Sequence, residues 1–209
     1  MKVLDLYAGL KSVTKEFEKA GHEVISLDID PRFECSITAD ILGVAVQMLG
    51  TQGDFDLIWA SPPCEAFSVA SIGHHWTGGR GAYIPKTERA VKNQEIVAHT
   101  VRLMAGLNPQ HGWIMENPRG VLRKLDVVKG LPRVTVTYCQ YGDDRMKPTD
   151  LWGSFPRGWA PKPMCKNGDA CHVAAPRGSR TGTQGRKNAA ERAMIPQGLI
   201  KSLFIRRPK

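Results

Sequence analysis

Short apolar runs alternate with amphipathic stretches along the chain, and this pattern predicts strands joined by helices. Apolar runs over residues 2–6, 24–27 and 57–60 predict buried strands. Further strands are expected over residues 37–41, 113–115 and 134–138. Because helical stretches separate most of these runs, we expect an α/β fold with a mixed, mostly parallel sheet and helices on both of its faces.

The helical stretches carry apolar residues at the spacing of a core-facing stripe. One lies around Phe17 after the first strand, and a short helix is expected over residues 44–49. A long helix starts after Thr87, which can cap it, and its apolar stripe is interpreted as core. A closing helix is expected over residues 188–204, with Pro196 at its start. Its apolar residues are expected to pack onto the sheet: Leu199, Ile200 and Leu203.

The charge balance favours a polyanionic partner. The chain of 209 residues has 29 Lys and Arg against 20 Asp and Glu, a net charge of +9. Its five cysteines are odd in number and show no paired spacing, and no apolar secretory stretch lies near Met1, so we expect a reducing, cytoplasmic setting. No apolar stretch is long enough to span a bilayer, so a membrane protein is not expected.

The composition changes between residues 157 and 187, where seven Lys or Arg residues stand against one acidic residue. Such a stretch has too few apolar side chains for a core of its own. We therefore expect a main domain over residues 1–156, a small irregular basic insertion over 157–187, and a returning helix with a basic tail over 188–209. The insertion is expected to contact phosphates and read a groove, and a solvated loop is the alternative. The candidate DNA contacts are Arg80, Arg157, Arg177, Arg180, Arg186 and Lys187.

The stretch from Ser61 to Ser68 presents a cysteine in a rigid turn directly after a predicted strand. Pro62 and Pro63 fix the backbone and remove two donors, so the chain leaves the strand stiffly with Cys64 at its carboxyl end. The chemistry of α/β proteins gathers at that edge of the sheet. Cys64 is thus a candidate nucleophile that attacks as its thiolate, and a small buried packing residue is the alternative.

Polar residues also end the first strands, in the manner of a nucleotide-binding opening. Asp5 ends the first strand, Gly9 turns the chain, and Asp28 ends the second strand, where a ribose hydroxyl is commonly held. Solvated charges at strand ends are an equally good explanation. Asp40 either accepts a hydrogen bond from an adenine amino group or caps the helix that follows it.

Two further groups of residues are set apart by their chemistry. Glu116 and Asn117 end the strand that starts at residue 113, and so form a second polar group at the carboxyl edge of the sheet. The segment over residues 71–83, rich in glycine, aromatic and basic residues, is interpreted as a mobile lid, with a plain surface loop as the alternative.

Three residues of the basic insertion are chemically suited to zinc: Cys165, Cys171 and His172. Cys139 or another residue could supply the fourth ligand that a structural zinc ion needs. The spacing of these residues matches no standard zinc finger. The sequence therefore predicts no metal centre, and a zinc site in the insertion stays an alternative.

Taken in order, the motifs resemble those of the DNA (cytosine-5) methyltransferases, over residues 3–152 and again at the closing helix. Residues 5–9 resemble the block that holds S-adenosylmethionine, residues 62–68 resemble the nucleophile block, and Glu116 with Asn117 resembles the acid block. The resemblance implies a Rossmann-like methyltransferase fold in a small or phage-type member of the family. It implies these cofactor-binding residues: Asp5, Leu6, Tyr7, Ala8, Gly9, Asp28, Ile29, Asp40, Ile41 and Pro63.

The resemblance also implies a reaction. A methyl group would pass from S-adenosylmethionine to C5 of a cytosine flipped out of double-stranded DNA, after Cys64 adds to C6 of the ring. Glu116, kept protonated at the end of its buried strand and held in place by Asn117, would donate toward N3. Arg145 and Lys147, in an approximate match to an Arg-rich block, are candidates for contact with the base. We expect a monomeric protein in a bacterial or phage-infected cell, in a restriction-modification setting.

Departures from the family pattern leave other functions open. The chain has Glu65 where Gln is usual, and Lys11 where further glycines are usual. Lys11 would suit a cofactor analogue with an extra carboxylate, and so the transfer of a modified methyl group. Residues 61–64 also resemble a motif of the enzymes that methylate exocyclic amino groups, N4 of cytosine or N6 of adenine, although those enzymes place an aromatic residue where Cys64 stands. A catalytically inactive DNA-binding protein with the same fold is the third alternative.

Overall fold

A seven-stranded sheet forms the centre of the computed structural model, which describes residues 1–173 and 188–204. The strand order is β3-β2-β1-β4-β7-β9-β8; β1 to β4 and β7 run parallel, and β9 runs antiparallel to both β7 and β8. The strands are β1 (Lys2–Leu6), β2 (Glu23–Asp28), β3 (Ile37–Thr38), β4 (Leu57–Ala60), β7 (Trp113–Pro118), β8 (Arg133–Thr137) and β9 (Pro148–Gly153). The predicted mixed, mostly parallel sheet is confirmed.

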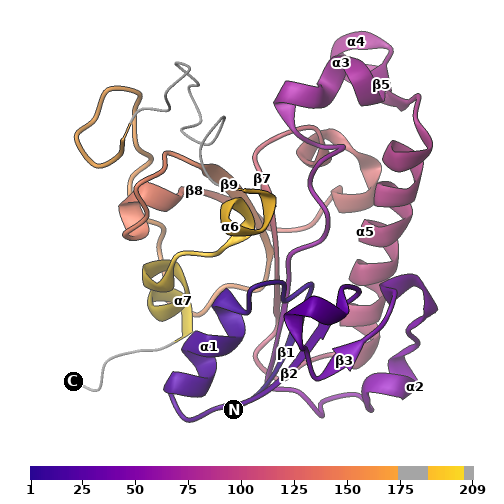
Figure 1. Cartoon of the computed structure of the whole chain (residues 1–209), viewed down its shortest axis with the longest axis vertical. Helices are drawn as coiled ribbons and strands as arrows, with labels where there is room; N and C mark the ends of the chain where they lie inside the picture. Colours follow the sequence, from indigo (N-terminus) through magenta and orange to yellow (C-terminus); the bar gives the residue numbers. More distant parts are fainter. Residues whose placement is uncertain (174–187, 205–209) are drawn as a thin grey trace.

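Helices cover both faces of this sheet (Figure 1). One face carries α1 (Ser12–Lys19) and α7 (Gln197–Phe204), and the other carries α2 (Val46–Leu49) and α5 (Glu88–Leu107). The 3₁₀ helices are η1 (Pro31–Phe33), η2 (Ile41–Gly43), η3 (Val69–Ser71), η4 (Leu122–Lys124), η5 (Asp126–Val128) and η6 (Tyr138–Tyr141). Thr87 caps α5 as predicted, because its hydroxyl accepts from the Ala90 N–H at 3.2 Å.

The alternation of side chains along each strand supplies two separate cores. In β4, Leu57 and Trp59 pack with α1 and α7, whereas Ile58 and Ala60 pack with α5. All four residues are fully buried. A strand buried on both faces reads as a continuous apolar run, and the sequence of β4 has that pattern.

The order of the strands reverses between β1 and β4. From β1 the chain builds outward through β2 and β3, and then returns to place β4 on the other side of β1. The Ser61 N–H donates to the Leu6 carbonyl at 3.2 Å, so the segment after β4 leaves the sheet directly beside the end of β1. Ligands of open α/β sheets bind at such a switch point, outside the carboxyl ends of the strands.

Strand β9 was not expected from the sequence. All six of its residues are buried although Thr149 and Asp150 are polar. The Asp150 carboxylate accepts from the Thr135 hydroxyl at 2.7 Å and from Arg123 Nε at 2.8 Å. These partners offset the cost of burying the carboxylate. Because they come from outside β9, the local sequence does not predict this strand.

The predicted single closing helix is wrong, because the structure has two helices there. These are α6 (Ala189–Ala193) and α7, separated by an extended stretch that contains Pro196. Proline cannot donate the backbone hydrogen bond that a continuous helix would need at this position. The predicted packing of Leu199, Ile200 and Leu203 is confirmed, because all three are buried against the sheet.

The expected lid segment has structure of its own. It comprises η3, α3 (Ile72–His75), α4 (Gly79–Ala82) and an antiparallel pair, β5 (Trp76–Thr77) with β6 (Ile84–Pro85), at one end of α5 (Figure 1). Trp76 anchors the segment, because its ring stacks on Phe67 and its Nε1–H donates to the Ala66 carbonyl at 2.6 Å. A movement of the segment as a lid stays a prediction.

No helix within residues 1–173 and 188–204 has both the length and the apolar character needed to cross a bilayer.

Candidate active site

The turn after β1 and the end of β2 form one unit. Tyr7 and Gly9 both have left-handed backbone conformations, with φ of 63° and 50°. The Gly9 N–H donates to Asp28 Oδ2 at 2.9 Å, and this hydrogen bond holds the Asp28 carboxylate against the turn after β1. The Tyr7 hydroxyl is hydrogen-bonded to Thr100 on α5. The structure thus brings together three of the predicted cofactor-binding residues.

Next to Asp28, Ile29 is an exposed apolar side chain, with 61% of its surface accessible. A carboxylate beside an exposed apolar surface, at the switch point of the sheet, suits the ribose and the purine of an adenosine group. The residues present at this edge therefore fit S-adenosylmethionine.

Asp40 and Ile41 lie further along the same edge. Asp40 caps η2, because its Oδ1 accepts from the Leu42 N–H at 3.1 Å, and it lies 3.7 Å from Lys92 Nζ. Capping was one of the two alternatives for Asp40, although the capped element is η2 and not the helix that follows. Ile41 is buried in the core. Contacts of these two residues with a cofactor stay predictions.

Asp5 connects the end of β1 to the start of α1. It is almost fully buried, and its Oδ2 accepts from both the N–H and the hydroxyl of Thr14 at the start of α1, at 3.1 and 2.6 Å. Burial raises the pKa of Asp5 to about 7, against the lowering effect of these hydrogen bonds. Asp5 therefore acts on the cofactor edge by holding the start of α1 in place.

Asp5→Asn should change how stability depends on pH. The pKa of Asp5 is raised on folding from 3.8 to about 7, so the native state retains this proton between those pH values while the unfolded state loses it. The wild type should lose up to about 4 kcal/mol relative to Asp5→Asn as pH rises from 4 to 7, measured by urea unfolding without cofactor. The exposed Asp126→Asn variant should follow the wild type. Parallel profiles for the wild type and Asp5→Asn would contradict the raised pKa.

The loop after β4 is held by β7 and the turn that follows it. Asn117 Nδ2 donates to the Pro62 carbonyl at 2.9 Å, in a fully buried contact. The Val121 N–H donates to the Phe67 carbonyl at 2.8 Å. Cys64 lies between these two attachment points and is half-buried. Asn117 therefore positions the segment that carries the candidate nucleophile.

Gly120→Ala should loosen this attachment. A Cβ at Gly120 would lie 2.1 Å from the Phe67 carbonyl oxygen, which is backbone and cannot turn aside. We expect a loss of about 2–3 kcal/mol in the free energy of unfolding by urea. Gly43→Ala is the matched control, since a Cβ there would meet nothing within 4 Å. Equal stabilities of the two variants would show that the contact is not needed.

Glu116 lies in a buried polar cluster at the end of β7. Its Oε1 accepts from the Tyr138 hydroxyl at 2.7 Å and lies 3.8 Å from Lys147 Nζ. Lys147 also donates to the Arg192 carbonyl at 3.0 Å and lies over the Tyr138 ring. Sequence reasoning missed Tyr138, because nothing in its local sequence shows that its hydroxyl reaches across to β7.

The charges of this cluster affect the pKa of Cys64. Burial raises the pKa of the Cys64 thiol, the positive charge of Lys147 opposes that rise, and the carboxylate of Glu116 adds to it. The predicted nucleophile, the predicted acid and Lys147 therefore share one electrostatic environment. Burial has the larger effect on the Cys64 pKa, and the positive charge of Lys147 offsets part of it in favour of the thiolate.

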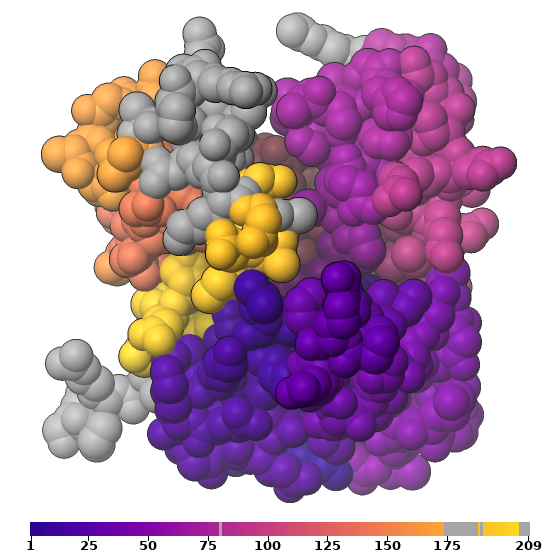
Figure 2. All heavy atoms as spheres, viewed as in Figure 1, coloured from indigo at the N-terminus to yellow at the C-terminus, as the bar shows by residue number. Residues whose placement is uncertain are grey.

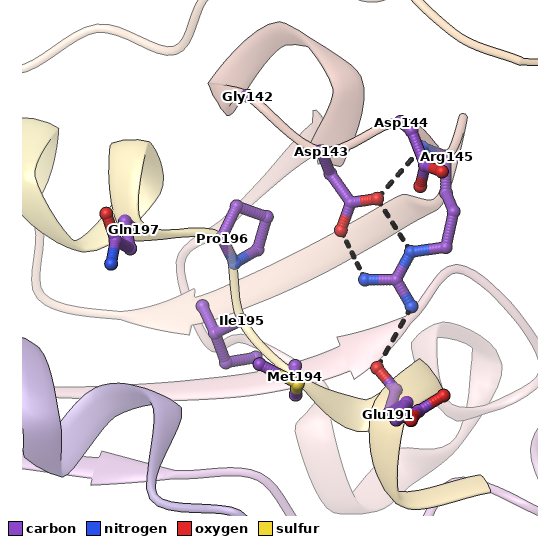
Figure 3. A pocket seen from close by; sticks show the side chains of 9 residues that line it. All are labelled: Gly142, Asp143, Asp144, Arg145, Glu191, Met194, Ile195, Pro196 and Gln197. Carbon is purple, nitrogen blue, oxygen red and sulfur yellow. Dashed lines mark hydrogen bonds and ion pairs between the residues drawn. The ribbon is translucent and has the colours of Figure 1, made fainter. Parts of the chain in front are cut away.

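Arg145 has a different environment from Lys147. Figure 3 shows its guanidinium turned toward Asp143 and α6, at a pocket lined by residues 142–145, Glu191 and residues 194–197. Nε donates to Asp143 Oδ1 at 2.7 Å, and Nη1 donates to the Arg192 carbonyl at 3.1 Å. Only 3% of the Arg145 surface is exposed. Arg145 thus ties the segment between η6 and β9 to α6, and its predicted contact with a base stays a prediction.

The two unusual residues of the motifs make surface contacts. Glu65 pairs with Arg89 of α5 at 2.8 Å, where both side chains are largely exposed. Lys11 begins α1 in a left-handed conformation, and its Nζ donates to the Glu34 carbonyl at 2.5 Å. This contact ties the start of α1 to the segment between β2 and β3.

The predicted DNA contacts are only partly covered by the structure. Arg157 lies exposed after β9, and Arg80 belongs to α4. Arg177, Arg180, Arg186 and Lys187 lie outside the described residues. Figure 2 shows the surface hollowed between the magenta segment that follows Cys64 and the yellow α6. The expected basic insertion shows no helix or strand over residues 157–173.

The structure brings together the three residues considered for zinc, with Cys139 as a fourth. The ligand atoms of Cys139, Cys165, Cys171 and His172 all lie within 4.8 Å of one another.

Two solved structures share this fold. The methyltransferase EhMeth of Entamoeba histolytica matches with a TM-score of 0.53 at 12% identity, over 79% of this chain and 57% of its own. The Dnmt2 methyltransferase of S. pombe matches with a TM-score of 0.51 at 13% identity, over 74% and 49%. This chain thus spans about half the length of both proteins, and at such identities the likeness concerns the fold alone. The fold is that of a Rossmann-like methyltransferase.

Sequence comparison defines the family. The profile of the C-5 cytosine-specific DNA methylases matches residues 1–124, and the chain belongs to this family. It is 28% identical over 219 residues to the probable DNA (cytosine-5)-methyltransferase of Frog virus 3 (isolate Goorha), across 98% of this chain and 99% of that protein. It is 25% identical over 134 residues to the type II methyltransferase M.XorII of Xanthomonas oryzae pv. oryzae (strain KACC10331 / KXO85), across 56% and 28%. The predicted class of enzyme, a DNA (cytosine-5)-methyltransferase, is confirmed.

Proposed function

We propose that this protein methylates C5 of a cytosine rotated out of duplex DNA, through a transient covalent bond between Cys64 Sγ and C6 of the ring. The strongest support is the arrangement around β7. Its end carries Glu116 beside Lys147, and the next residue, Asn117, holds the loop of Cys64. The family makes C5 of cytosine the position to be modified, and this arrangement supplies the groups that the modification needs.

The covalent bond is needed because C5 of cytosine is a weak nucleophile. The Cys64 thiolate donates an electron pair to C6, and the π electrons of the C5–C6 bond move through the ring toward N3. Glu116, in its acid form, gives a proton to N3 and so prevents charge from building up there. C5 becomes electron-rich as a result. After transfer N3 returns its proton to Glu116, and loss of the C5 proton to a base re-forms the double bond and expels the Cys64 thiolate.

S-adenosylmethionine, when bound, supplies the electrophilic methyl carbon. Asp28 would hold its ribose and Ile29 its purine, at the edge formed by the ends of β1 and β2. Asp5 and Gly9 keep this edge in shape through Thr14 and Asp28. The cofactor edge and the loop of Cys64 meet at the Leu6–Ser61 backbone contact, so cofactor and target ring would lie side by side.

The half-buried position of Cys64 supports base flipping. A ring stacked inside a duplex cannot reach a thiol in this position, so the base has to leave the helix. Unstacking costs a few kcal/mol, and contacts within the pocket and with phosphates can offset that cost. The net charge of +9 and the exposed Arg157 favour binding to the backbone of DNA.

Mass analysis of nucleosides tests this proposal. DNA from methylation-deficient bacterial cells that express the protein should contain 5-methylcytosine, and DNA from cells that express Cys64→Ala should not. N4-methylcytosine or N6-methyladenine would show an exocyclic amino methyltransferase instead. A cytosine that carries a group heavier than methyl would show that a modified cofactor is used. Unmodified DNA would show that the protein is inactive. Each of these three results would contradict the proposal.

A further inference from the structure

Four potential metal ligands converge at the base of the basic insertion. Cys139 belongs to η6, and Cys165, Cys171 and His172 follow β9 in the segment before residue 174. Cys165 Sγ lies 3.3 Å from Cys171 Sγ and 3.3 Å from His172 Nδ1. Cys139 Sγ lies 3.7 Å from Cys171 Sγ. The residues come from two segments that are far apart in the sequence.

These separations lie close to the edges of a zinc coordination tetrahedron, and the other pairs of ligand atoms are at most 4.8 Å apart. With Zn–S bonds of about 2.3 Å and a Zn–N bond of about 2.0 Å, neighbouring ligand atoms lie about 3.5 to 3.8 Å apart. A disulfide would need its two sulfur atoms at about 2.05 Å, well below the 3.3 Å between Cys165 and Cys171. The cluster therefore has the spacing of a metal site and not that of a cross-link.

Residues 161–170 have little apolar packing to hold them in place. Between residues 161 and 170, Cys165 is the only buried residue, and residues 157–173 form no helix or strand. Polar contacts position this segment: the Cys165 N–H donates to Thr137 Oγ1 at 3.0 Å, the Val173 N–H to the Asp144 carbonyl at 2.8 Å, and Lys162 donates to the Tyr141 hydroxyl and the Gln140 carbonyl of η6 at 2.9 and 2.7 Å. A bound metal can replace the hydrophobic core that such a segment lacks.

A further contact suits a metal-bound thiolate. Gln140 Nε2 lies 3.5 Å from Cys171 Sγ, where it can donate to the sulfur from outside the ligand set. Three thiolates and one imidazole form a closed set of four protein ligands, the arrangement of a structural zinc site with no open position for catalysis.

We propose that Cys139, Cys165, Cys171 and His172 bind one structural zinc ion, which fastens the start of the basic insertion to η6. The residue before Cys139 is Tyr138, whose hydroxyl donates to Glu116. The zinc ion would thereby fix the insertion next to the polar cluster at the end of β7. The proposal concerns metal binding by these four residues, and it does not depend on the proposed reaction.

Metal content of the purified full-length protein tests the proposal. Protein produced in zinc-supplemented medium and purified under reducing conditions without a chelator should contain one zinc per chain by elemental mass spectrometry. Replacement of the zinc by Co²⁺ should give the strong visible d–d bands of a tetrahedral site and thiolate-to-cobalt charge-transfer absorption. A zinc content near zero, or a Cys165–Cys171 disulfide under these conditions, would overturn the proposal.

Variants show which residues bind the metal. Cys165→Ser and Cys171→Ser should each lose most of the zinc. His172→Ala in the presence of Co²⁺ should not give the cobalt spectrum of the wild type. Cys35→Ser and His111→Ala are matched controls outside the cluster and should keep the full zinc content. Equal zinc contents in cluster and control variants would overturn the assignment. If cluster variants fail to fold, the stoichiometry and the cobalt spectrum of the wild type still decide the question.

Discussion

Replacing Cys64 with alanine should lower the rate of cytosine methylation by a factor of about 10³ or more, to the detection limit of a tritium-transfer assay. Without the thiolate no electron pair reaches C6, and C5 stays unreactive. Cys64 is only half-buried, and its loop is held by hydrogen bonds from the Asn117 side chain and the Val121 N–H that the substitution leaves in place. The variant should therefore keep its thermal unfolding midpoint and its calorimetric affinity for S-adenosylmethionine.

Cys35→Ser is the control for the loss of a thiol as such. Cys35 is half-buried in the segment between η1 and β3, and it should not be needed for turnover. Methylation by Cys64→Ala at a rate close to that of the wild type would rule out nucleophilic catalysis by this residue.

Replacing Glu116 with glutamine should slow methylation about a hundredfold or more while DNA binding stays close to that of the wild type. The glutamine side chain has the same size, and its Oε1 can still accept from the Tyr138 hydroxyl. It cannot give a proton to N3, so the step that relieves charge in the ring is lost. Turnover and DNA affinity are measured separately, by single-turnover methyl transfer and by fluorescence anisotropy.

Glu95→Gln is the matched control, because Glu95 lies exposed on α5 and should tolerate the same chemical change. A wild-type rate for Glu116→Gln would remove Glu116 from the acid role. It would leave Glu116 with a purely structural role as a partner of Tyr138 and Lys147.

The segments that carry the candidate chemistry could be predicted because their signals are local. Strand β4 reads as an apolar run, and the diproline turn after it fixes where Cys64 stands. Glu116 and Asn117 follow a second apolar run in the same way, so their place at the carboxyl edge needs only the parallel direction of the strands. The family motifs add specificity to these positions.

Features that depend on distant partners could not be predicted. Strand β9 buries Asp150 because Arg123 and Thr135 pair with it, and neither lies in β9. Nothing in the local sequence separates Arg145, which contacts Asp143 and α6, from Lys147, which lies beside Glu116. In each case tertiary contacts decide the role of a side chain.

The convergence of four zinc ligands illustrates the same limit. Cys139 lies before β9 and the other three ligands lie after it, so the set has no compact spacing along the chain. Zinc fingers are found in sequences because their ligands stand in short fixed intervals. The sequence names the four residues only as an alternative, and the segment after β9 brings their ligand atoms together by returning along η6, where the Cys165 N–H donates to Thr137 Oγ1 and the Lys162 N–H donates to the Tyr141 hydroxyl.

Trapping on DNA that contains 5-fluorocytosine tests the central claim most directly. Fluorine at C5 cannot leave as a proton does, so the bond between Cys64 and C6 persists after methyl transfer. With S-adenosylmethionine present, the wild type should form a protein–DNA complex that resists denaturation. Peptide mass analysis should place the linkage on Cys64, and Cys64→Ala should form no complex. A wild type that methylates unmodified DNA but forms no complex with the fluorinated DNA, or a linkage on another residue, would contradict the account.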